Sequence, residues 1–62
     1  MPIIEFKAFE HRLGDEQKTT ALIRRLTDAV RETYGDDVAH QTQVILYAIP
    51  PARWGIDGAP AG

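Results

Sequence analysis

The residues best able to do chemistry stand at the start of the chain, where Met1 is followed by Pro2. Inside a chain, proline has no N–H and its nitrogen is an unreactive amide. If Met1 is removed, Pro2 exposes a free secondary amine that can act as a base or a nucleophile. Many chains begin with Met-Pro, and proline also suits the start of an edge strand, so a structural role stands beside the chemical one.

Arg12 is the second side chain of chemical interest, in a loop predicted over residues 10–14. Its guanidinium is a planar fork that suits a bidentate contact with a carboxylate. An arginine in a loop is otherwise an ordinary solvated charge, as is the neighbouring His11. Residue type alone leaves both interpretations open.

Three segments are expected to position these residues. Residues 3–9 alternate with a period of two and predict a strand, which would anchor the amino terminus, whereas most termini fray. Apolar residues recur at helical spacing over 15–34, and Gly35 follows as a helix cap. Residues 42–49 are apolar on both faces, which is typical of a buried strand in a parallel pair. The order predicts an α/β (α+β) protomer built as a right-handed βαβ unit.

After the second strand, Pro50-Pro51 ends the ladder because proline has no N–H to donate. Residues 52–58 alternate apolar and turn residues and predict a short hairpin, and residues 59–62 are expected to fray. The sequence contains no internal repeat or linker, so we expect residues 1–62 to form a single domain.

Size and composition indicate self-association. A chain of 62 residues without cysteine lacks the disulfides that stabilise many small domains, yet 44% of its residues are hydrophobic. We therefore expect other copies to complete the core. A net charge of −2 gives no electrostatic reason to expect nucleic acid or an anionic membrane as a partner. Without an apolar run of about 20 residues or a signal peptide, the chain is expected to be cytoplasmic.

Four features together resemble the 4-oxalocrotonate tautomerase family over nearly the whole chain: Pro2, Glu10-His11-Arg12, Asp15-Glu16-Gln17-Lys18 and Trp54-Gly55-Ile56-Asp57-Gly58. The resemblance implies a βαβ protomer that pairs into dimers and assembles as a hexamer, a trimer of dimers. It implies an isomerase that needs no metal or organic cofactor. The mature amino-terminal proline would move a proton between an oxygen and a carbon of an enol acid, giving the keto isomer.

The resemblance also implies roles for particular residues. Pro2 would be the general base, and Arg12 would bind a substrate carboxylate. Phe9, Trp54 and Ile56 would form an apolar pocket, in which burial and nearby cations lower the pKa of an amine toward neutrality. Trp54 suits equally a wall of the pocket and a hydrophobic plug between subunits.

The chain departs from the family at Gln43, where many members carry a second arginine that holds the far end of the substrate. A glutamine amide donates hydrogen bonds but carries no charge, which favours a monoacid over a diacid. Arg53 would replace the missing charge only if its side chain turned inward. The sequence does not decide between these two residues.

Two other functions fit the same pattern. One is the addition of water to an unsaturated acid, including hydrolytic dehalogenation, which would need a carboxylate such as Asp57 or Glu10 facing Pro2. A glycine-flanked aspartate is, however, usually a turn former. The other is a non-catalytic subunit that pairs with a homologous partner supplying the missing arginine.

Overall fold

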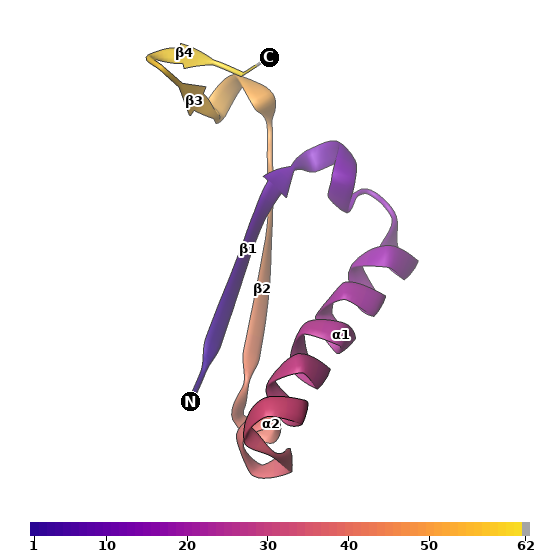
Figure 1. The fold of residues 1–62 in the computed structure, drawn as a ribbon. Coiled ribbons are helices and arrows are strands. Elements are labelled where there is room, and N and C mark those ends of the chain that lie inside the picture. The colour runs from indigo at the N-terminus through magenta and orange to yellow at the C-terminus, as the bar shows by residue number, and fades with distance from the viewer. Residues whose placement is uncertain (62) are drawn as a thin grey trace.

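The computed structural model describes residues 1–61, whose elements follow the predicted order of strand, helix and strand (Figure 1). Strand β1 spans Ile3–Phe9 and strand β2 spans Gln43–Ile49. They pair in parallel over their full length, beginning with Ile3 opposite Gln43. The predicted parallel pairing is therefore confirmed, and the second strand begins one residue later than expected.

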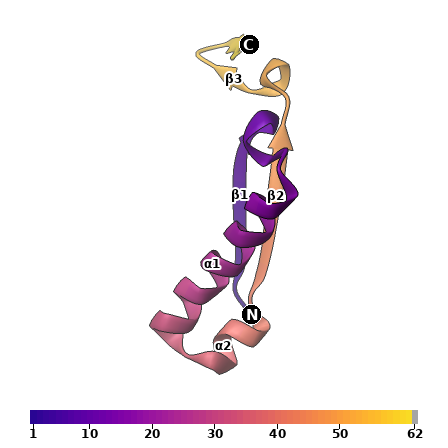
Figure 2. The same cartoon turned by 90° about the vertical axis from the view of Figure 1, so that its right-hand side faces the viewer.

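Helix α1 spans Glu16–Tyr34 and lies along one face of the strand pair (Figures 1 and 2). Asp15 caps its start, because its carboxylate accepts a hydrogen bond from the backbone N–H of Gln17 at 2.9 Å. At its end, the N–H of Gly35 donates to the carbonyl of Arg31 at 2.8 Å, and the φ of +97° at Gly35 suits glycine. The predicted helix over 15–34 is correct to within one residue.

A second helix, α2, spans Asp36–Gln41 and was not predicted from the sequence. Its six residues are too few to show an apolar period, which is the signal on which helix prediction depends. Asp36 and Asp37 in its first turn favour the positive end of the helix dipole. Arg31 connects the two helices through its ion pair with Asp36 at 2.9 Å.

Single 3-10 turns follow both strands. The turn η1 spans Glu10–Leu13 inside the segment predicted as a loop, and η2 spans Pro51–Arg53 after β2. Pro51 suits the first position of such a turn because it has no N–H to leave unpaired. These turns end the strand pair at one edge and direct the chain toward α1 and toward the C-terminal hairpin.

The C-terminal hairpin pairs β3, Gly55–Ile56, with β4, Ala59–Pro60. Asp57 and Gly58 form its two-residue turn with φ values of +51° and +83°, as a type I′ turn requires. The carbonyl of Trp54 also accepts a hydrogen bond from the N–H of Ala61 at 2.8 Å. The hairpin therefore lies closer to the C-terminus than the predicted range of residues 52–58. The expectation of fraying is wrong for residues 59–61, and residue 62 lies outside the described residues.

The strand pair has one covered face and one open face. On the face toward α1, Ile4, Val44 and Leu46 are half-buried. The opposite face, which we call the outer face, is formed by Ile3, Glu5, Lys7 and Phe9 of β1 and by Gln43, Ile45, Tyr47 and Ile49 of β2. Within residues 1–61, Ala39 alone is fully buried, at 3% exposure. One copy of the chain therefore encloses almost no core.

The exposed area gives the same result quantitatively. The chain exposes 4882 Å², whereas a compact monomer of this mass is expected to expose about 4,000 Å². The excess of roughly 900 Å² is close to the area that each partner buries in an interface of standard size.

Among the helices of residues 1–61, none is long and apolar enough to cross a membrane.

Candidate active site

Pro2 lies immediately before β1, where it is half-buried. Its carbonyl accepts a hydrogen bond from the backbone N–H of Gln43 at 3.0 Å, which extends the parallel ladder by one step. Met1 precedes it and is 74% exposed, so removing Met1 disturbs little packing. Two of the six predicted site residues, Pro2 and Gln43, are therefore neighbours at the edge of the strand pair where both strands begin.

An aromatic cluster stands at the opposite edge. The ring centroids of Phe9 and Trp54 are 4.7 Å apart with their planes inclined at 60°, a favourable geometry for two aromatic rings. The ring of His11 stacks near Phe9, with centroids 6.2 Å apart. Because Phe9 ends β1 and Trp54 follows η2, this contact fixes the hairpin segment to the strand pair.

The two remaining predicted residues lie near this edge and are open to solvent. Arg12 belongs to η1, and within residues 1–61 it forms no ion pair. Ile56 belongs to β3 and is 59% exposed. Asp57, the candidate acid of a water-adding enzyme, occupies the tight turn beyond Ile56. Its conformation accounts for an aspartate at this position without a catalytic role.

The two groups of predicted residues are far apart in one protomer. Pro2 and Phe9 are separated by the length of β1, which is about 23 Å at about 3.3 Å per residue. A substrate with only a few carbon atoms does not span that distance. A single copy thus brings Pro2 together with Gln43, and Phe9 together with Trp54, but does not join the two groups.

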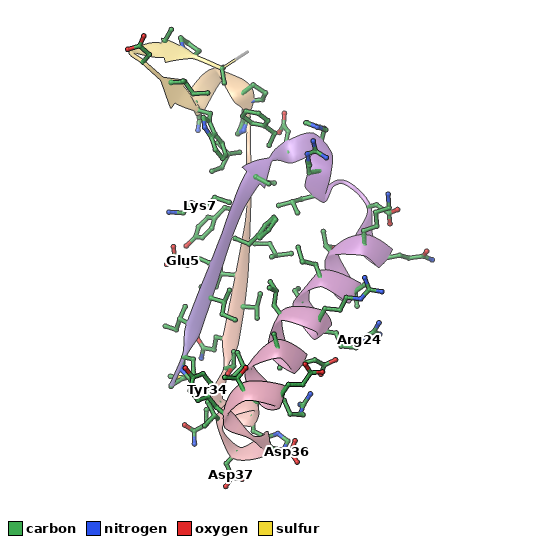
Figure 3. All side chains as sticks on the ribbon, viewed as in Figure 1. Glu5, Lys7, Arg24, Tyr34, Asp36 and Asp37 are labelled. Carbon is green, nitrogen blue, oxygen red and sulfur yellow. The ribbon has the colours of Figure 1, made fainter. Side chains whose placement is uncertain are left out.

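A pocket of about 250 Å³ opens beside the aromatic cluster, lined by Lys7, Ile49, Arg53, Trp54 and Gly55. Lys7 projects from β1 on the side away from α1, as does Glu5 (Figure 3). Sequence reasoning gave Lys7 no role, because a lysine on an exposed strand position carries no signal of its own. Arg53, considered from the sequence as a replacement for the second arginine, lines this pocket at the edge opposite to Pro2 and Gln43.

A larger groove of about 530 Å³ runs along the start of α1. None of the predicted site residues lines it; its walls are Asp15, Gln17, Lys18, Ala21, Leu22 and Arg25. Among residues 1–61, no three histidine, aspartate or glutamate side chains lie close enough to hold a metal ion. The candidate site thus consists of the two edges of the strand pair.

The family model described as "Tautomerase enzyme" matches residues 2–62. The chain belongs to the tautomerase family. This tautomerase is also similar to a solved structure described as TomN, a 4-oxalocrotonate tautomerase homologue in the tomaymycin biosynthetic pathway. The two share 33% identity and a TM-score of 0.80, over 97% of this chain and 88% of that chain. No curated protein matches this tautomerase. The predicted family and the predicted βαβ fold with a C-terminal hairpin are both confirmed.

Proposed function

We propose that this tautomerase interconverts the enol and keto forms of a small unsaturated carboxylic acid, with Pro2 as its base after removal of Met1. The observation that carries the assignment is the hydrogen bond from the N–H of Gln43 to the carbonyl of Pro2. It holds the first residue of the mature chain in the sheet, although most termini fray. A base held at one position gains the rate advantage of proximity.

The proposed reaction is a proton transfer in two steps. The amine of Pro2 takes the proton of the enol hydroxyl, and the electron pair of the O–H bond forms the carbonyl group. The electron pair of the C=C bond then takes the proton back from the prolinium at carbon. The product is the keto isomer, and the amine is regenerated with no atom gained or lost.

The other site residues bind the substrate and exclude water. Arg12 binds the carboxylate and stabilises the negative charge that spreads toward it in the transition state. Phe9, Trp54 and Ile56 form an apolar wall, which disfavours the charged form of a nearby amine and so lowers its pKa. The backbone N–H of Gln43 donates to Pro2, and its side-chain amide offers the substrate a neutral hydrogen-bond donor.

Each such site needs two copies of the chain. Because Pro2 and Phe9 are about 23 Å apart within β1, the Pro2 edge of one copy has to meet the Trp54 edge of another. The uncovered outer face and the excess exposed area support this association. The assembly that we propose is the hexamer, a trimer of dimers, to which the family resemblance points.

The test is an activity assay on material whose mass is known. Intact mass determines whether Met1 is absent, and loss of enol absorbance measures turnover of 2-hydroxymuconate and phenylenolpyruvate. We expect the mature chain to convert at least one of them and chain that retains Met1 to be inactive. A mature, assembled protein that converts neither would instead favour a non-catalytic subunit.

A further inference from the structure

The pocket beside Trp54 has two cationic walls and two apolar ones. Lys7 and Arg53 supply the charges, and Ile49 and Trp54 supply the apolar surface. Within the described part of the chain, residues 1–61, no acidic residue lines the pocket. A cavity of this composition attracts an anion that carries a short carbon skeleton.

The two cations are not equivalent. The ammonium group of Lys7 is 3.6 Å from the carboxylate of Glu5 and 5.4 Å from the ring centroid of Tyr47, so part of its charge is already engaged. Within residues 1–61, Arg53 forms no ion pair. Its guanidinium can therefore bind a ligand without breaking an ion pair within residues 1–61, and its planar fork matches a carboxylate.

We propose that the pocket between Lys7, Arg53 and Trp54 binds a second carboxylate of the substrate, at the end away from the one that Arg12 holds, with Arg53 as its principal cation. This assignment rests on the proposed function, because it concerns the substrate of the same site. It places next to the aromatic cluster the charge that Gln43 lacks. Lys7 adds long-range attraction, while Ile49 and Trp54 contact the carbon chain.

The first experiment uses Trp54 as its own probe, since it is the one tryptophan of the chain. Adipate, a saturated dicarboxylate that cannot react, is titrated into the assembled protein while Trp54 emission is recorded. We expect a saturable change for adipate and none for dimethyl adipate or for inorganic phosphate at the same ionic strength. Equal responses to adipate and phosphate would overturn the proposal, because the pocket would then bind anions without regard to carboxylate geometry.

The second experiment compares three variants in the same titration. Arg53→Ala is expected to raise the dissociation constant of adipate about tenfold or more, since a hydrogen bond to a charged group contributes roughly 1.5–3 kcal/mol. Arg53→Lys should recover part of the loss, because it restores the charge but not the fork. Arg24→Ala removes the same charge from α1, away from the strand pair (Figure 3), and should leave adipate binding unchanged.

Kinetics separates this inference from the proposed function. Arg53→Ala should raise KM for a diacid enol such as 2-hydroxymuconate and have a much smaller effect on a monoacid such as phenylenolpyruvate, while Pro2→Ala should lower kcat and still bind adipate. If Arg53→Ala binds adipate with wild-type affinity, that result contradicts the inference and leaves the proposed role of Pro2 untouched. Full turnover by Pro2→Ala would instead remove the proposed base and leave the carboxylate pocket intact.

Discussion

The chemistry proposed for this tautomerase depends on an amine that exists only after Met1 has been removed. Until then the nitrogen of Pro2 belongs to an amide, which has no lone pair available for proton transfer. The exposure of Met1 and the hydrogen bond at the carbonyl of Pro2 leave the nitrogen side of the residue free to react. The proposed reaction therefore depends on one residue and on its covalent state.

Pro2→Ala tests the base directly. Alanine leaves a primary amine on a more flexible residue, so we expect kcat to fall because the base is less well held, by at most the roughly 10² to 10⁴ that a general base contributes. Size-exclusion chromatography should show the same assembly as wild type, because only the terminal side chain changes. Wild-type turnover by the assembled variant would contradict the assignment.

Arg12→Ala tests the contact with the substrate carboxylate. Loss of a charge-assisted contact in a desolvated site is expected to cost about 2–5 kcal/mol, mainly as a rise in KM with some loss of kcat. The matched control is Arg24→Ala on α1, which should change neither constant. The methyl ester of the same enol should be nearly insensitive to Arg12→Ala, whereas equal losses for acid and ester would make Arg12 a structural residue.

At the scale of elements, the C-terminal hairpin determines where Trp54 and Ile56 lie. Its turn depends on Gly58, whose φ of +83° is costly for any residue with a Cβ. Among the described residues, and apart from the glycine and its two chain neighbours, no heavy atom lies within 4 Å of the position that a Cβ at Gly58 or Gly55 would take. A substitution at either glycine therefore reports on backbone conformation and not on crowding.

Gly58→Ala is expected to destabilise the hairpin by about 1–2 kcal/mol, the cost of the left-handed conformation for an L-residue. Gly55→Ala is the matched control. Gly55 does not have a positive φ, but the space around its Cβ position is as open as at Gly58. Trp54 emission during urea unfolding measures both variants. If the two substitutions cost the same, the strain at Gly58 does not control the hairpin.

At the scale of the whole molecule, one copy of the chain encloses almost no core of its own. Ala39 is its one fully buried residue within residues 1–61, while Ile3 and Ile45 on the outer face are 56% and 39% exposed. Burying such side chains contributes about 25 cal/mol per Å² of apolar area. Folding and association are therefore expected to occur together.

The melting temperature should consequently depend on concentration. When folding and association are coupled, mass action raises the melting temperature as the protein becomes more concentrated, which circular dichroism can follow over about a hundredfold range. Analytical ultracentrifugation at the same concentrations should show the oligomer and no folded monomer. A melting temperature that is independent of concentration, together with a monomeric mass, would contradict this expectation.

Mixing inactive variants tests whether two copies share a site. Pro2→Ala and Arg12→Ala are unfolded, mixed in equal amounts and refolded together, and turnover is compared with each variant refolded alone. If the two residues of a site come from different copies, about one quarter of the sites in a random oligomer regain both native residues. If they come from the same copy, no site regains both and turnover stays at the level of the parents.

The sequence by itself determined the elements whose signals are local. The alternation over residues 3–9, the apolar period over 15–34 and the apolar run over 42–49 each gave the correct element, because these patterns reflect burial on one or both faces. The motif residues around Pro2, Arg12 and Trp54 indicated the family for the same reason, since each lies in a short stretch whose spacing is read directly. The six-residue helix α2 and the pairing of Ala59–Pro60 were missed because neither is long enough to show a period.

Only the tertiary structure decided how the candidate residues are distributed. Parallel pairing of β1 with β2 places Gln43 beside Pro2 at one edge and Ile49 beside Phe9 at the other, a placement that depends on register and not on composition. It also turns Arg53 and Lys7, which are 46 positions apart in the chain, toward the same pocket beside Trp54. Contacts of that kind arise from the packing of distant segments. No local pattern of residue types records them, because the free energy that selects them is gained only when the segments meet.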